Sequence, residues 1–366
     1  MDIGIVGLAK SGKTTVFNAL TRGHAETTAF GRSGLEPNVG VVKVPDPRMD
    51  QLALLTKPRK FTPAEVRYTD IGGTPPSFGR GEGFAGVMLN ALGRMDALLH
   101  VVRAFEDPAI PHPHGSVDPT RDIASVNLEI AFSDAGLVER RLERLANNLK
   151  AARPGEREAG LREQELLQRI KRDLDNEVPV REMTLDDDER TIIANYSLLS
   201  AKPLLTMVNI GEAQLDAAAP IEADYTARFR RPHTEVLAVC GKLEMELGLM
   251  EPEEATEFRT DLGVPEASLD RVIRASYALL GVISFFTVGD DENRAWTITR
   301  GDVAQRAAGK IHTDLEKGFI RAEVVPWQRL LEACGWAEAR KAGHLRSEGK
   351  TYAVQDGDVM NILFSK

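Results

Sequence analysis

The sequence predicts an α/β protein built on a mostly parallel sheet, with an inserted α-helical hairpin and a small C-terminal α+β domain of the β-grasp type. Three observations predict it: six short apolar runs separated by helical stretches, one long charged stretch with helical periodicity, and a change of pattern after about residue 280. The chain has 366 residues, 42% hydrophobic and 28% charged, which is typical of a globular protein of two or three domains.

The six apolar runs have the length and composition of β-strands. In order they are "DIGIVG", "VGVVKV", "AEVRYTD", "ALLHVVRAF", "PLLTMVNI" and "TEVLAVC". Strands that are mostly apolar and are separated by crossovers form parallel sheets covered by helices on both faces. We therefore expect these runs to make one largely parallel sheet.

Residues 122–177 interrupt this alternation between the fourth and fifth runs. Apolar residues recur there at helical spacing among dense charges of both signs, and "RPG" at Arg153–Gly155 breaks the pattern. The stretch predicts two antiparallel helices in a projecting hairpin. Its charges indicate either a solvated helical face or an arm that docks on a large partner.

The C-terminal stretch has a different order of elements. "VISFFTVG" and "RAWTITRG" predict a hairpin around "DDEN", followed by a helix, an extended "RAEVV", a second helix and a final pair of strands in "KTYAVQDGDVMNILF". The predicted segments are 1–120 and 191–280 for the two parts of the sheet domain, 121–190 for the helical insertion and 281–366 for the β-grasp domain.

Composition excludes several classes of protein. The net charge of −9 removes the simple argument for nucleic-acid binding, and two cysteines, Cys240 and Cys334, give neither a disulfide framework nor a zinc cluster. The longest apolar run, "YALLGVISFF", is shorter than the roughly 18 residues that span a bilayer. We expect a cytoplasmic protein without membrane contact; the sequence does not indicate its oligomeric state.

The turn after the first predicted strand carries a phosphate-binding motif. "GLAKSGKT" matches G-x-x-x-x-G-K-[ST], in which backbone N–H groups surround the β-phosphate, the lysine reaches the β- and γ-phosphates and the hydroxyl ligates Mg²⁺. The strand before it and the helix after it are the context that the motif requires. The predicted nucleotide contacts here are Gly7, Ala9, Lys10, Ser11, Gly12, Lys13, Thr14 and Thr15.

A second motif ends the third predicted strand. "DIGG" places Asp70 and Gly73 in the pattern D-x-x-G, so Asp70 is expected to join Thr14 at the Mg²⁺ ion and the Gly73 N–H to sense the γ-phosphate. The residues that follow would form a switch that orders with the triphosphate.

The predicted base pocket lies at the ends of the last two strands. "NIGE" provides Asn209, Ile210 and Glu212 where Ras-like GTPases have N-K-x-D, and Cys240 and Gly241 follow the next strand. The lysine is absent and the acid is one methylene longer. Since a displaced acceptor loses the paired hydrogen bonds to guanine, the pattern argues against guanine selectivity.

With these motifs the chain resembles the YchF-type Obg-like ATPases, a branch of the translation-factor-related P-loop GTPases. Four long runs carry the resemblance: Glu36–Leu52, His100–Asp107, Ala307–Val325 and Glu348–Met360. The resemblance implies a G domain with a helical arm, a C-terminal TGS domain, ATP preferred to GTP, slow hydrolysis, and association with ribosomes.

The same resemblance implies a catalytic histidine. The position after Gly73 is Thr74, so the water-orienting glutamine of Ras-like enzymes is missing, and His112 in "IPHPHG" aligns with the histidine that the family is thought to use; His114 is its neighbour. With Lys13 and Gly73, His112 completes the predicted catalytic set.

Departures from the family pattern indicate a divergent member or paralogue. Ala9–Ser11 replace P-N-V, and the segments Ala29–Leu35 and Ile71–Ser77 differ from the expected sequences; they overlap the two segments that would order with MgATP, Thr27–Asn38 and Gly72–Gly83. Lys10 stands where an asparagine helps hold potassium in related enzymes, so its ammonium could supply that charge.

The leading hypothesis is a nucleotide switch that binds MgATP, hydrolyses it slowly and acts on the translation machinery. Two alternatives stay open: a GTP-specific regulator of the Obg type, and a nucleotide-binding adaptor with negligible turnover. In the TGS-like domain four residues form a candidate RNA-facing set, with an ordinary solvated helix as the alternative: Lys310, His312, Lys317 and Arg321.

Overall fold

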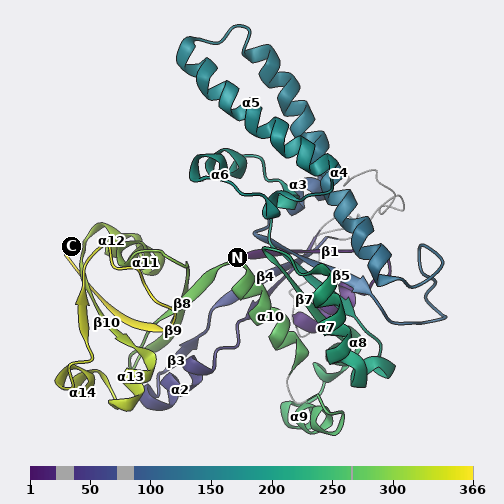
Figure 1. Cartoon of the computed structure of the whole chain (residues 1–366). Coiled ribbons are helices and arrows are strands. Elements are labelled where there is room, and N and C mark those ends of the chain that lie inside the picture. Colours follow the sequence, from purple (N-terminus) through teal and green to yellow (C-terminus); the bar gives the residue numbers. More distant parts are fainter. Residues whose placement is uncertain (22–36, 72–85, 265–266, 366) are drawn as a thin grey trace. The chain divides into compact units, whose positions relative to one another are not determined.

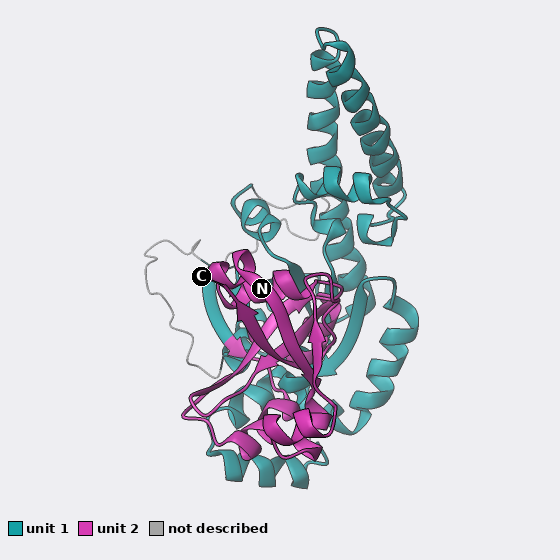
Figure 2. Cartoon of the chain, turned by 90° about the vertical axis from the view of Figure 1, so that its left-hand side faces the viewer, with its two compact units in different colours: residues 1–41, 67–272 teal, residues 42–66, 273–366 magenta. Residues whose placement is uncertain are grey.

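The computed structural model describes residues 1–21, 37–71, 86–264 and 267–365. Its contacts divide the chain into two units, Met1–Val41 with Arg67–Val272 and Val42–Val66 with Ile273–Lys366 (Figure 2). In the described ranges no helix is long and apolar enough to span a bilayer.

The first unit is built on a six-stranded sheet with the order β2-β4-β1-β5-β6-β7. Figure 1 labels four of these strands, β1, β4, β5 and β7. All six predicted strands are confirmed, and β4, β1, β5, β6 and β7 run parallel, as expected. Every residue of the central strand β5 is buried. The bounds are β1 (Asp2–Val6), β2 (Asn38–Lys43), β4 (Glu65–Asp70), β5 (Ala97–Arg103), β6 (Leu204–Asn209) and β7 (Thr234–Val239).

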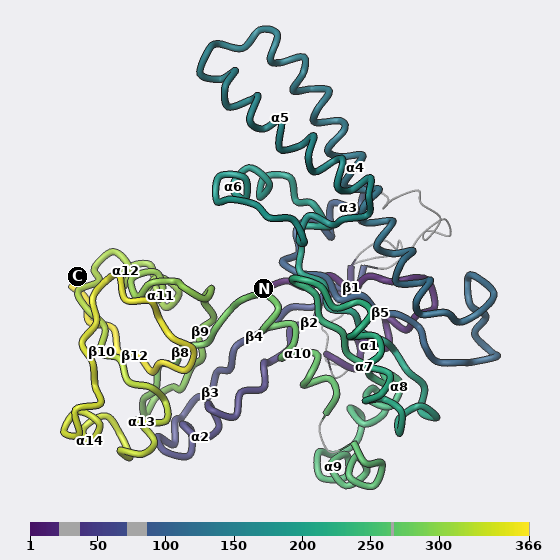
Figure 3. Tube along the Cα trace, in the orientation of Figure 1, coloured from purple at the N-terminus to yellow at the C-terminus, as the bar shows by residue number. Residues whose placement is uncertain are grey.

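Helices connect these strands and carry the hairpin. α4 and α5 run side by side, as predicted (Figure 3), and both begin with a proline at the first helical turn. Val138, Leu167 and Ile170 are fully buried between them. The helices are α1 (Lys13–Leu20), α3 (Gly86–Gly93), α4 (Pro119–Asn148), α5 (Pro154–Asp175), α6 (Asp187–Ala194), α7 (Ala218–Phe229), α8 (Gly241–Leu247), α9 (Pro252–Asp261) and α10 (Ser268–Leu279), with 3₁₀ turns η1 (Val180–Glu182), η2 (Leu199–Ala201) and η3 (Glu212–Ala217).

The second unit contains another six-stranded sheet, with the order β11-β10-β12-β8-β9-β3. The predicted β8–β9 hairpin is confirmed. The predicted final pair of strands is wrong: β12 is one strand, and β11 precedes the predicted stretch and pairs with β10. The elements are β3 (Lys60–Thr62), β8 (Val282–Thr287), β9 (Glu292–Thr299), β10 (Phe319–Pro326), β11 (Arg346–Glu348), β12 (Asp358–Phe364), α2 (Pro47–Thr56), α11 (Ala304–Ile311), α12 (Thr313–Lys317), α13 (Trp327–Glu332) and α14 (Trp336–Lys341).

One segment differs from the predicted segmentation. Residues 42–66 were predicted to lie within the first part of the sheet domain, but their contacts place them in the second unit. β3 pairs in parallel with β9, and the Thr56 hydroxyl donates to Oδ1 of Asn293 at 3.1 Å. Periodicity identifies a strand–helix–strand pattern here, but it does not say which sheet the strands join.

Candidate nucleotide-binding site

The P-loop connects β1 to α1, and its two motif glycines have backbone conformations that exclude a side chain. Gly7 has φ 148° and Gly12 has φ 95°. A Cβ on Gly7 would lie 2.3 Å from the Val101 carbonyl oxygen, and one on Gly12 would lie 2.3 Å from Nδ2 of Asn209. The close approach of the loop to β5 and β6 therefore requires glycine at both positions. Gly12 is also the N-cap of α1, so the helix N-terminus faces the loop.

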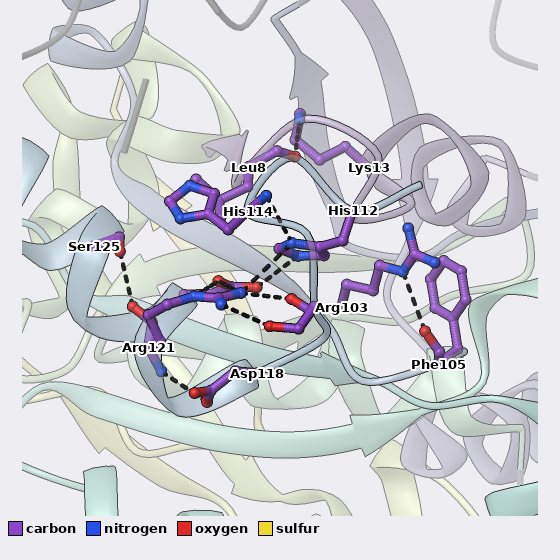
Figure 4. A network of polar contacts seen from close by, with 11 residues as sticks. Leu8, Lys13, Arg103, Phe105, His112, His114, Asp118, Arg121 and Ser125 are labelled. Atoms are coloured by element: carbon purple, nitrogen blue, oxygen red, sulfur yellow. Dashed lines mark hydrogen bonds and ion pairs between the residues drawn. The ribbon is translucent and has the colours of Figure 1, made fainter. Parts of the chain in front are cut away.

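Lys13 is held against this loop. Its Nζ donates to the carbonyl oxygens of Gly7 at 3.0 Å and Leu8 at 2.9 Å (Figure 4). Burial lowers the pKa of Lys13 to about 8, and the charge of Asp70 opposes that shift. The lysine is therefore a partly desolvated cation, which strengthens its attraction to an anion.

Thr14 and Asp70, predicted as the metal site, are brought together. The Thr14 hydroxyl donates to Oδ2 of Asp70 at 2.9 Å, although the two residues are 56 positions apart in the chain. Hydroxyl and carboxylate oxygens are the hard ligands that Mg²⁺ prefers, and the ion commonly takes only one or two protein ligands beside substrate phosphates. The pair fits Mg²⁺, which neutralises phosphate charge when bound. Gly73, the third residue of this prediction, lies outside the described residues.

Ala9, Lys10 and Thr15 are the remaining predicted P-loop contacts. Ala9 and Lys10 are exposed, and Thr15 is partly buried. Lys10 has φ 64°, a left-handed conformation that asparagine adopts more readily than lysine. The ammonium of Lys10 is thus carried on an exposed part of the loop.

Asn209 joins the phosphate loop to the predicted base pocket. Its Nδ2 donates to the Ser11 carbonyl at 2.9 Å, and its Oδ1 accepts from the Gly241 N–H at 3.0 Å. The side chain is 3% exposed. A Cβ on Gly241 would lie 3.2 Å from Oδ1 of Asn209, so this approach is also tight. The structure therefore brings three predicted site residues together, because Asn209 connects Ser11 of the phosphate loop to Gly241 of the predicted base pocket.

The other base-pocket residues divide between core and surface. Ile210 and Cys240 are buried in one apolar cluster, 2% and 3% exposed, so their side chains serve packing. Burial raises the pKa of the Cys240 thiol. Glu212 is half exposed, and its Oε1 lies 2.8 Å from Nζ of Lys242. Its carboxylate is thus already ion-paired.

Arg103 and Phe105 also lie at this site, although no motif in the sequence points to them. The Arg103 guanidinium is buried, lies over the Phe105 ring at 4.5 Å and donates to the Phe105 carbonyl at 3.1 Å (Figure 4). Phe105 lies close to both halves of the site, since its side chain is 3.9 Å from a Cβ placed on Gly12 and 3.4 Å from one placed on Gly211. Arg103 itself could have indicated this part of the site, because an arginine at the end of a strongly apolar strand requires specific partners for its charge.

His112, the predicted catalytic residue, is buried in a polar network (Figure 4). Its Nε2 lies 2.9 Å from Oδ2 of Asp122, and its Nδ1 accepts the backbone N–H of His114 at 3.1 Å. Burial lowers the pKa of His112, and Asp122 opposes the shift. Nη2 of Arg121 also lies 3.5 Å from Nδ1. Both ring nitrogens are therefore engaged within the protein.

A P-loop, a hydroxyl–carboxylate pair and a bracing asparagine at the carboxyl ends of a parallel sheet define a P-loop nucleoside triphosphatase with the GTPase fold. A family model described as a 50S ribosome-binding GTPase matches residues 2–133, and one named YchF-GTPase_C, described as a protein of unknown function, matches residues 282–365.

Whole-chain comparisons narrow the class. The chain is 40% identical to the ribosome-binding ATPase YchF of Bacillus subtilis, over 100% of this chain and 99% of that protein. It is 41% identical to the protein of that name from Haemophilus influenzae, over 99% and 98%. The structure of the Schizosaccharomyces pombe YchF GTPase superposes with a TM-score of 0.85 at 30% identity, covering 99% of this chain and 97% of that one. The chain belongs to the YchF family.

Proposed function

We propose that this protein binds ATP with Mg²⁺ in preference to GTP, hydrolyses it slowly and uses the cycle to control a contact with the ribosome. One observation carries the nucleotide preference: the Glu212 carboxylate is paired with Lys242 at 2.8 Å. Guanine selectivity requires a carboxylate that is free to accept from two guanine N–H groups, whereas adenine presents no such pair of donors.

The rest of the pocket supports this proposal. Asn209 uses both ends of its amide on the backbone, and Ile210 is buried in the core. Both ends of the Asn209 amide and Oε1 of Glu212 are thus already engaged within the protein. Phe105, beside Gly12 and Gly211, offers an aromatic surface, and stacking on such a surface favours any purine over water.

Competition between nucleotides tests the preference. Fluorescent ATP and GTP analogues, bound with Mg²⁺ and displaced by unlabelled ATP or GTP, should show ATP ahead by tenfold or more, about 1.4 kcal/mol. Lys242→Met should narrow the preference because it frees Glu212, while Lys150→Met, at an exposed lysine of the hairpin, should not. A preference for GTP would identify the Obg-type regulator instead. If neither nucleotide bound, the adaptor would be favoured.

Hydrolysis is proposed to depend on His112. His112→Ala should lower kcat for ATP at least tenfold with little change in KM, because a water-positioning group acts mainly in the transition state. His114→Ala, which changes the exposed neighbour, is the matched control. In this conformation His112 is engaged with Asp122, so the role requires the loop to rearrange. An unchanged turnover in His112→Ala would favour the adaptor.

The ribosome contact rests on the names of the relatives, which are ribosome-binding ATPases. The candidate RNA-facing residues of the second unit, Lys310, His312, Lys317 and Arg321, are all exposed. The α4–α5 hairpin offers a second docking surface. Sedimentation of the protein with purified ribosomes, with ATP, with ADP and without nucleotide, tests this contact; no co-sedimentation in any state would contradict it.

A further inference from the structure

A cavity of about 290 Å³ lies in the first unit at the end of the sheet where β6 and β7 begin. The nucleotide site lies at the other end, where these strands finish. Leu204 and Thr234, the first residues of β6 and β7, line it, whereas Asn209 at the nucleotide site is the last residue of β6. Thr206, the third residue of β6, also lines the cavity, so three residues of strand, about 10 Å, separate the lining from Asn209. α4, α7 and the 3₁₀ turn η1 supply the other walls.

Arg181, on η1, is the distinctive residue of this cavity. It is 9% exposed, its Nη1 donates to the Ser200 carbonyl at 3.3 Å, and its Nε has no hydrogen-bond partner. Within the described residues no carboxylate lies close enough to form an ion pair with it, although the charges of Glu182 and of buried Asp134 act on it from farther away. Burial lowers the pKa of Arg181 to about 10, which still leaves it charged at neutral pH. A buried guanidinium that no carboxylate contacts carries a large desolvation cost.

The remaining charges around the cavity are balanced differently. Arg228 is paired with Asp224 at 3.2 Å, and Arg231 donates to the Arg230 carbonyl at 2.8 Å. Glu177 and Glu182 also line the cavity, and the charges of Glu182 and of Asp134 on α4 raise the pKa of Arg181 without cancelling the effect of burial. Three arginines therefore face two glutamates in the lining, and Arg181 is the buried arginine, whose Nε has no partner.

Neutral groups complete the lining. Oδ1 of Asn127 is buried without a hydrogen-bond partner, which leaves a further polar atom beside the arginine for a ligand to contact. Leu128, Val178 and Phe229 contribute apolar walls. Arginine presents its donors as a planar fork that matches carboxylate and phosphate groups. The volume lies at the lower limit of small-molecule sites, about 300–1,000 Å³.

We propose that this cavity is a binding site for a small organic anion, whose carboxylate or phosphate group pairs with Arg181 and whose apolar body packs against the α4 and α7 walls. The site is separate from the nucleotide site and does not depend on the proposed ATP preference. It lies against α4, which also carries Asp122, the partner of His112.

Isothermal titration with three probes tests the proposal. Benzoate carries a carboxylate and phenyl phosphate carries a phosphate, so the two probes show which anionic group the site prefers. Inorganic phosphate tests whether the anion binds without an apolar body. The full-length protein carries Lys13→Met throughout, to weaken phosphate binding at the P-loop, in a low-chloride buffer at pH 7.5. At least one organic probe should bind, and Arg181→Met should weaken it at least tenfold. Arg190→Met, the same change at an exposed arginine of α6, should leave it unchanged.

A second variant keeps the test decisive if Arg181→Met does not fold. Asn127→Asp places a carboxylate inside the cavity without changing side-chain size. It should raise the melting temperature in anion-free buffer, because it places a carboxylate where Arg181 has no ion pair, and it should weaken probe binding at least tenfold. The proposal is overturned if no probe binds, if Arg181→Met binds as tightly as its parent, or if Asn127→Asp lowers the melting temperature and leaves probe binding unchanged.

Discussion

Replacing Lys13 with methionine should weaken ATP binding at least 100-fold at pH 7, about 2.7 kcal/mol. Methionine keeps most of the apolar stem but removes the charge and all three donors. In the wild type the ammonium is nearly buried and held by the carbonyl oxygens of Gly7 and Leu8, so its charge is little screened by water. Hydrogen bonds from charged groups to phosphate are among the strongest that a protein makes.

The pKa of Lys13 predicts a pH dependence of ATP binding that a general loss of structure would not produce. The free protein has a pKa of about 8 at this site, below the ordinary 10.5, so the lysine loses its proton as the pH rises through 8. A bound triphosphate favours the ammonium and raises that pKa. Between pH 8 and the raised value the complex therefore holds more protons than the free protein, and ATP affinity should fall as pH rises, by up to tenfold per unit.

Titration calorimetry in buffers of different ionisation enthalpy measures this proton uptake directly. Wild type should take up a fraction of a proton at pH 8.5, and Lys13→Met should take up none from this source. Lys150→Met, the same substitution at an exposed lysine, should behave as wild type. Wild-type affinity that is constant from pH 8 to 9.5 would contradict the assigned role of Lys13.

Replacing Asn209 with leucine should destabilise the nucleotide-free first unit by about 2–4 kcal/mol. Leucine has a similar shape but leaves the Ser11 carbonyl and the Gly241 N–H without their partners, and Asn209 is 3% exposed, so water cannot readily replace it. Each buried backbone group left unpaired costs about 1–3 kcal/mol. Because the same bonds hold the P-loop to the base pocket, ATP binding should weaken as well.

Urea unfolding followed by far-ultraviolet circular dichroism measures this effect. Tryptophan fluorescence is unsuitable as the only probe, because Trp296, Trp327 and Trp336 all lie in the second unit. Asn195→Leu is the matched control: its amide bonds only to carbonyls one turn back in α6, so it should change stability by less than about 0.5 kcal/mol. Equal urea midpoints for Asn209→Leu and wild type would show that the hydrogen bonds of Asn209 do not contribute to stability.

Local patterns predicted most of the architecture. Alternating apolar runs predicted all six strands of the first sheet, and the break at Arg153–Gly155 predicted the turn between α4 and α5. Such features depend on residues close together in sequence, where periodicity and turn chemistry decide the outcome. The pairing of β3 with β9 joins residues more than 200 positions apart, so no local pattern contains it.

The nucleotide site also contains features that follow from local sequence and features that depend on tertiary contacts. The motif residues Gly7, Gly12 and Lys13 lie within one stretch of seven residues, and their conformations follow from the strand, loop and helix to which they belong. The roles of Asn209 and Glu212 depend on what lies opposite: Gly241 and Lys242 reach them only when β6 and β7 are adjacent. Phe105 likewise acquires its place beside Gly12 from the packing of β5 against β1.

The sequence by itself determined the strands, the hairpin, the phosphate loop and the membership of a family, because each rests on residue types at fixed spacing. Only the tertiary structure decided which sheet residues 42–66 join, that His112 is buried against Asp122, and that Arg181 lines a cavity without an ion pair to any described carboxylate. The physical reason is that the residues around a charged group decide whether it is buried and whether it is paired. Those surroundings come from segments that the chain brings together only when it folds.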